Sequence, residues 1–128
     1  MTVRRHLCLW LPVVAWMGTI FFLSAQPDLP HPSLGWLDLL ISSAAHTFLF
    51  AVLAALWARA LGQGRRSWLL AAALTVLYAL SDEFHQSFVP GRHADPWDLA
   101  FDVLGTGLGL AGWIWLTRRI SMSPKSRS

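Results

Sequence analysis

The chain has 128 residues, of which 55% are hydrophobic and 13% are charged, and that charged fraction is about half of the soluble average. A soluble domain this small could not hide so much apolar surface, so the composition excludes an ordinary soluble fold and favours a membrane protein. The net charge of +3 comes mostly from short arginine clusters beside apolar segments, a pattern that indicates membrane topology rather than nucleic-acid binding.

Four apolar segments predict four membrane-spanning helices. The first two cover residues 7–23 and 39–61 and reach the roughly 20 residues that a bilayer core of about 30 Å requires. The third, residues 68–86, reaches this length only if its polar end stays helical, and the fourth, residues 98–117, only with Asp102 inside it. We therefore predict an all-α, four-helix transmembrane bundle in one domain, residues 1–120, followed by a disordered basic cytoplasmic tail, residues 121–128.

The first segment has a rival interpretation as a cleaved signal peptide. Arg4 and Arg5 precede an apolar run that ends near Ser24-Ala25-Gln26. The run is longer than the roughly 7–15 residues of a signal-peptide core, and no Ala-x-Ala cleavage site follows it. An uncleaved first helix is therefore favoured.

The basic residues predict the orientation of the bundle. With four alternating crossings, nine of the ten Lys and Arg residues fall on one side of the membrane. The positive-inside rule makes that side cytoplasmic, together with both termini. The basic tail is expected to contact anionic lipid headgroups. The nine residues are Arg4, Arg5, Arg59, Arg65, Arg66, Arg118, Arg119, Lys125 and Arg127.

Polar and ionisable residues gather at the opposite side. The third helix runs outward and ends in residues 82–86, and the fourth begins there with Asp98 and Asp102, which are four residues apart and share a helix face. His46 lies about seven residues into the second helix, at a similar depth. Gly105 and Gly109 form a GxxxG pattern, which allows close approach of another helix.

Asp102 requires a partner, because a carboxylate in the hydrocarbon region is unfavourable by about 2.5–3.5 kcal/mol. Arg92, in the loop between the third and fourth helices, is the only permanently charged cation on this side and so the first candidate. Pairing with Arg92 would place the carboxylate and the guanidinium together at the outer face.

One long motif resembles a known family. Residues 81–92 (SDEFHQSFVPGR) and residues 95–105 (DPWDLAFDVLG) resemble the motif of the VanZ-like membrane proteins, as do residues 22–27 and 46–50. The family often has an Asp-Lys pair shortly before the histidine, where this chain has Ser and Ala at residues 42–45. The resemblance implies a small multi-pass protein of the cell membrane, and the family's namesake is associated with low-level resistance to the glycopeptide teicoplanin.

The residues that match this motif form the candidate site. We predict catalytic roles for Glu83, His85 and Asp102, with Glu83 and His85 as general base and acid. No tight metal motif such as H-E-x-x-H appears, so no metal site or cofactor is predicted, although a divalent metal remains open. Substrate-binding roles are predicted for His46, Asp82, Gln86, Arg92 and Asp98.

Three functions fit this candidate site. It is an enzyme that acts on a lipid-linked envelope substrate, a non-catalytic module that binds such a substrate or a glycopeptide, or a structural bundle whose polar groups only lock the helices together. The sequence favours one of the two functional interpretations and does not choose between catalysis and binding. Membrane lipids are expected partners, and nucleic acid is not.

Overall fold

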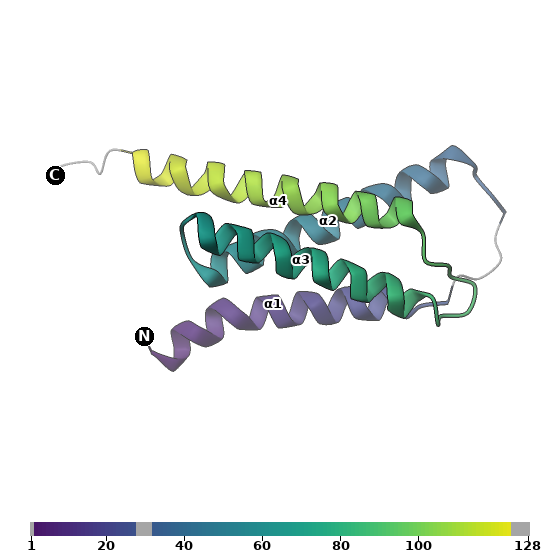
Figure 1. The fold of residues 1–128 in the computed structure, drawn as a ribbon, viewed down its shortest axis with the longest axis horizontal. Coiled ribbons are helices and arrows are strands. Elements are labelled where there is room, and N and C mark those ends of the chain that lie inside the picture. The colour runs from purple at the N-terminus through teal and green to yellow at the C-terminus, as the bar shows by residue number, and fades with distance from the viewer. Residues whose placement is uncertain (1, 28–31, 124–128) are drawn as a thin grey trace.

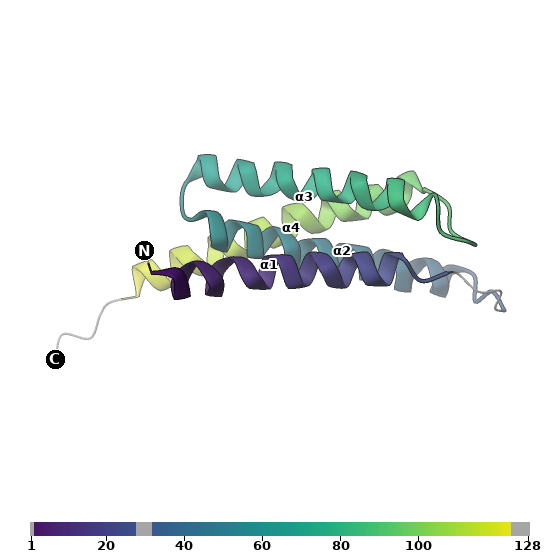
Figure 2. The ribbon, with the colours of Figure 1, turned by 90° about the horizontal axis from the view of Figure 1, so that it is seen from below.

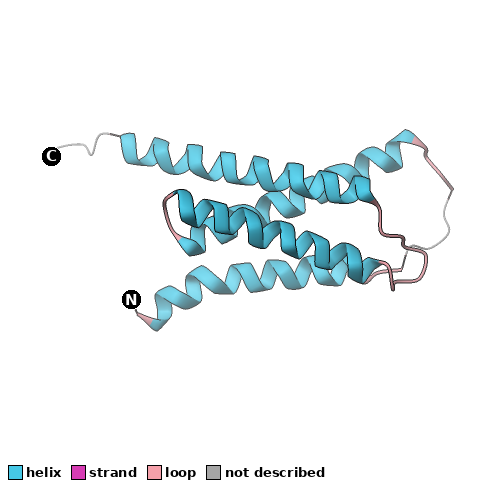
Figure 3. Cartoon of the chain, viewed as in Figure 1, coloured by secondary structure: helices cyan, strands magenta, loops and turns pink. Residues whose placement is uncertain are grey.

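Four long helices make up the fold (Figure 1). The computed structural model describes residues 2–27 and 32–123, and within these ranges it contains no strand (Figure 3). Each helix is long and apolar enough to cross a membrane. The protein is therefore an all-α, multi-pass membrane protein, as predicted. The helices are α1 (Val3–Ser24), α2 (Trp36–Leu61), α3 (Arg65–Gln86) and α4 (Pro96–Met122).

The helices extend slightly beyond their predicted bounds. α3 continues to Gln86, so the polar residues 82–86 are helical. α4 begins at Pro96 because the side chain of Asp95 accepts a hydrogen bond from the backbone N–H of Trp97 at 2.9 Å, a helix N-cap. α4 ends at Met122, so two residues of the predicted tail are helical, and residues 124–128 lie outside the described part of the chain.

The two ends of the bundle differ in character. The start of α1, the turn between α2 and α3 and the end of α4 lie together. The end of α1, the start of α2 and the connection between α3 and α4 lie at the opposite end (Figures 1 and 2). Every described arginine except Arg92 belongs to the first end, which we call the basic end. We call the other the polar end. This segregation fits the predicted topology, while the sidedness of the bundle stays a prediction.

The helices pack in the manner of a membrane bundle. Val13, Phe50 and Leu53 are buried in the core, and many other large apolar side chains face outward, where lipid would surround them. Hydrogen bonds join neighbouring helices: Tyr78 Oη donates to the carbonyl oxygen of Met17 at 2.6 Å. Because lipid is as apolar as the core, close packing and such hydrogen bonds hold the helices together.

The predicted GxxxG contact joins α4 to α2. A Cβ atom at Gly105 would collide with the backbone carbonyl of Thr47, and one at Gly109 with that of Ala51. Only glycine permits this approach of the two backbones. The contact places the first turns of α4 directly beside His46 on α2.

Candidate functional site

A histidine from α2 and an aspartate from α4 form the centre of the site. His46 Nδ1 lies 2.7 Å from Asp102 Oδ1, and the Asp102 side chain is 0% exposed. His46 Nε2 lies 3.6 Å from Asp98 Oδ2. The two aspartates thus share a helix face, as predicted, and both carboxylates lie near the imidazole of His46.

The predicted pairing of Asp102 with Arg92 is wrong. Arg92 Nε donates to the carbonyl oxygen of Gln26 at 2.8 Å, and Nη2 donates to that of Leu23 at 3.5 Å. These carbonyls lie at and just beyond the C-terminal end of α1, where the helix dipole favours a positive charge. Arg92 therefore ties the loop between α3 and α4 to α1, and His46 takes the place beside Asp102.

Glu83 on α3 completes a cluster of three ionisable side chains. Its Oε2 atom accepts a hydrogen bond from the backbone N–H of Asp95 at 3.0 Å. One ligand atom from each of His46, Glu83 and Asp102 lies within 4.8 Å of the other two. We call these three residues the triad. They come from α2, α3 and α4, so the packing of three helices fixes their geometry.

Two other predicted site residues link α3 to α1. Gln86 Nε2 donates to Asp82 Oδ2 at 3.1 Å and to Ser24 Oγ at 3.4 Å. Asp82 and Gln86 are both buried. The Gln86 amide thus donates to one residue on α3 and one on α1, and these two hydrogen bonds fix its position.

His85 lies apart from the triad. Its ring stacks on Phe21 of α1 with centroids 4.5 Å apart. Glu83 and His85 are two positions apart on α3, and residues at that spacing point in different directions. The proposed general base and general acid therefore do not face one another, and His46 is the histidine beside Glu83.

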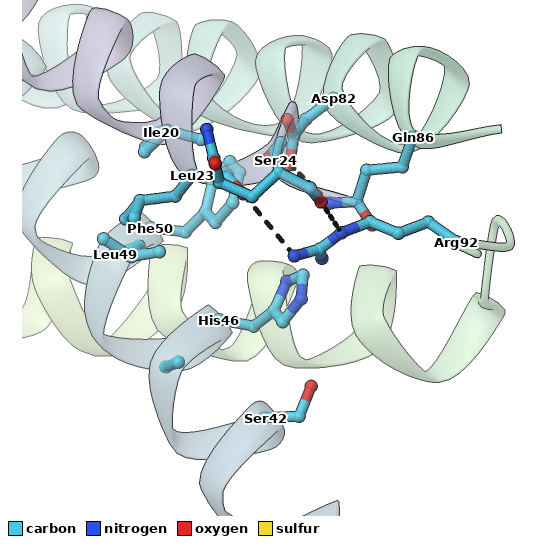
Figure 4. A pocket seen from close by; sticks show the side chains of 12 residues that line it. Ile20, Leu23, Ser24, Ser42, His46, Leu49, Phe50, Asp82, Gln86 and Arg92 are labelled. Carbon is cyan, nitrogen blue, oxygen red and sulfur yellow. Dashed lines mark hydrogen bonds between the residues drawn. The ribbon is translucent and has the colours of Figure 1, made fainter. Parts of the chain in front are cut away.

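A cavity opens beside His46 of the triad (Figure 4). Its volume is about 350 Å³, and the side chains of His46 and Arg92 both point into it. A smaller cavity of about 240 Å³ adjoins it, and Ser42, Gln86 and Arg92 line both. The larger cavity is lined by Ile20, Leu23, Ser24, Gln26, Ser42, Ala45, His46, Leu49, Phe50, Asp82, Gln86 and Arg92.

The sequence interpretation did not include two small polar residues of this cavity. Ser24 ends α1 and Ser42 lies in the second turn of α2, so both reach the same depth as the predicted site. The available signal for Ser24 was its place in the segment 22–27, which resembles the family motif. Ser42 lies in the segment 42–45, where this chain departs from the family's Asp-Lys pair. Depth alone was not enough, because serine is common at helix ends for capping.

One comparison with known proteins gives a match. The sequence model of the family described as VanZ/LLP1 matches residues 9–117, which is most of the chain. No significant match was found among curated proteins or among solved structures.

Proposed function

Because the chain belongs to the VanZ/LLP1 family of membrane proteins, we propose that its polar end binds an amphiphilic, lipid-linked substrate of the cell envelope. The observation that carries this proposal is the mixed lining of the larger cavity. Ile20 and Phe50 contribute an apolar wall, and His46, Arg92 and Gln86 contribute a polar one. An amphiphile with an anionic head matches both walls.

The two adjoining cavities suggest how such a molecule would lie. The smaller cavity is lined mainly by polar residues, including His93, Asp95 and Asp98. A headgroup would occupy this side, and the first part of a lipid chain would occupy the apolar side of the larger cavity. At about 350 Å³ the larger cavity is near the lower limit for ligand sites, so the remaining chain would extend into the bilayer.

The triad would supply the chemistry if the protein is an enzyme. Asp102 holds His46 by one ring nitrogen, which is the way a carboxylate orients a general base in many hydrolases. Glu83 would act as the second proton-transferring group beside it. His85 keeps its proposed role only if it leaves Phe21 during turnover.

The proposed location of the substrate follows from the topology. With both termini in the cytoplasm, as the basic residues predict, the polar end would face the outer surface of the cell membrane. A lipid-linked cell-wall precursor is the substrate class found there, and a glycopeptide such as teicoplanin is a second ligand class to test. A link to glycopeptide resistance would follow from either ligand.

Binding can be tested with a phosphorylated lipid. We expect the protein in lipid nanodiscs to bind a polyprenyl phosphate more tightly than the matched polyprenol. Arg92→Gln should weaken binding about 10-fold or more, because hydrogen bonds to charged groups contribute about 1.5–3 kcal/mol. The control is Arg66→Gln, the same chemical change at an exposed arginine of the basic end. Equal binding of both lipids, unchanged by Arg92→Gln, would contradict the proposal.

The enzymatic, binding and structural hypotheses predict different experimental outcomes. A labelled lipid-linked precursor should yield a modified product only if the protein is an enzyme. In cells, Glu83→Gln, His85→Ala and Asp102→Asn should leave the protein folded in the membrane but abolish any envelope or resistance phenotype. Normal behaviour of all three variants would leave only the structural alternative, which the hydrogen bonds between Gln86, Asp82 and Ser24 favour.

A further inference from the structure

Two buried carboxylate oxygens at the centre of the site have no partner. Glu83 Oε1 and Asp102 Oδ2 are shielded from solvent and make no hydrogen bond within the described part of the chain. Their residues are 7% and 0% exposed. Buried polar atoms are almost always satisfied, and an unpaired carboxylate at this depth is unfavourable. A ligand from outside the chain would satisfy these atoms.

The surroundings favour a cation over water alone. The triad brings two carboxylates together with one imidazole, and Asp98 adds a further carboxylate near His46. The permanent cation at this end, Arg92, donates to carbonyl groups at and just beyond the end of α1. Positive charge is therefore in deficit at the triad.

The geometry points to a site for a divalent transition-metal ion, such as Zn²⁺ or Mn²⁺, held by His46, Glu83 and Asp102. One nitrogen and two carboxylate oxygens suit these ions. The three ligand atoms lie within 4.8 Å of one another, and ligands about 2.1 Å from a tetrahedral ion are roughly 3.4 Å apart. Small side-chain rotations would close that difference.

Asp98 has a distinct part in this site. With His46 Nδ1 as the ligand atom, the ion would replace the hydrogen bond between Nδ1 and Asp102 Oδ1. Nε2 would then face Asp98 Oδ2, which lies 3.6 Å away. A carboxylate behind a metal-binding histidine fixes the orientation and tautomer of the ring. Asp98 is therefore a positioning residue. The remaining coordination position would face the cavity that His46 lines.

The first test is metal binding by the full chain. Protein in detergent micelles is stripped with EDTA, titrated with Zn²⁺ and analysed by mass spectrometry for metal content. We expect one ion per chain. His46→Gln, Glu83→Gln and Asp102→Asn should each weaken binding about 100-fold or more, and Asp98→Asn about 10–100-fold. The control is His93→Gln, since His93 is exposed and outside the triad.

A second variant separates ligand loss from misfolding. Glu83→His replaces one ligand type with another and should retain Zn²⁺ binding that Glu83→Gln loses. Substitution with Co²⁺ should give the visible absorption of a coordinated ion in the wild type and in Glu83→His. Substoichiometric binding by the wild type, or equal binding by the triad variants, would overturn the proposal. No lipid substrate is present, so failure of the proposed function would leave this result unchanged.

Discussion

Gly109→Ala tests the contact on which the site depends. A Cβ atom at this position would lie 2.7 Å from the Cα atom of Ala51 and nearer still to its carbonyl oxygen. These are backbone atoms of α2, so they cannot rotate away, and the two helices must separate. Overpacking of this kind destabilises by about 1–3 kcal/mol. The better helix propensity of alanine offsets up to about 1 kcal/mol, so with the full offset we expect a net loss of about 0–2 kcal/mol. Relative to an unobstructed Gly→Ala change in the same helix, the loss should stay at about 1–3 kcal/mol.

The same helix offers matched controls. Gly107 and Gly112 have no atom within 4 Å of the position that a Cβ would occupy. Gly107→Ala and Gly112→Ala should therefore leave the free energy of unfolding unchanged or raise it by up to about 1 kcal/mol. These three variants make the same chemical change and differ in what the new methyl group meets.

Unfolding in mixed detergent micelles measures this difference. Rising fractions of sodium dodecyl sulfate unfold the protein, and the eight tryptophans report the transition by fluorescence. Gly105→Ala has a second readout, because it separates Thr47, and with it His46, from α4. It should weaken the proposed Zn²⁺ binding more than Gly112→Ala does. If Gly109→Ala is as stable as Gly107→Ala, the backbones of α2 and α4 are not in contact.

Two further predictions concern helix packing and topology. Tyr78→Phe removes the hydrogen bond to the Met17 carbonyl and should lower the free energy of unfolding by about 0.6 kcal/mol, up to about 1.7; an unchanged unfolding transition would contradict this contact. In a Cys8→Ser background, free of native cysteine, a membrane-impermeant maleimide should label His93→Cys in intact cells and Gln63→Cys only after permeabilisation. The reverse pattern would invert the predicted topology.

Hydropathy was sufficient to predict the helices and the depth of the site. Four apolar segments gave four helices, and the polar residues 82–86 are helical as the length of the third segment required. Depth follows directly from position along each helix and from the direction of the crossing. This is why His46 and Asp102, which are 56 residues apart in sequence, were both placed in the candidate site.

Which helices contact one another was harder to predict than the depth of each residue in the membrane. The GxxxG pattern indicated that the fourth helix has a close partner, but not that α2 is that partner. Because the contact between α2 and α4 was not predicted, Arg92 was the plausible partner of Asp102. A permanent positive charge attracts a carboxylate more strongly than a neutral imidazole does. The actual position of Arg92 depends on carbonyl groups at the end of α1, and backbone acceptors carry no sequence signal.

The proposed metal site would remove an electrostatic obstacle to the proposed binding of an anionic substrate. An anionic headgroup would contact Asp98, which lines the smaller cavity, and would lie near the buried carboxylates of Glu83 and Asp102. These carboxylates would repel it. Arg92 offsets this only in part, because its guanidinium already donates to the carbonyls of Leu23 and Gln26. A divalent ion on the triad would balance two carboxylates and leave a coordination position toward the cavity. That position could accept a phosphate oxygen, so the residues that repel the substrate in the metal-free protein would hold the ion that binds it.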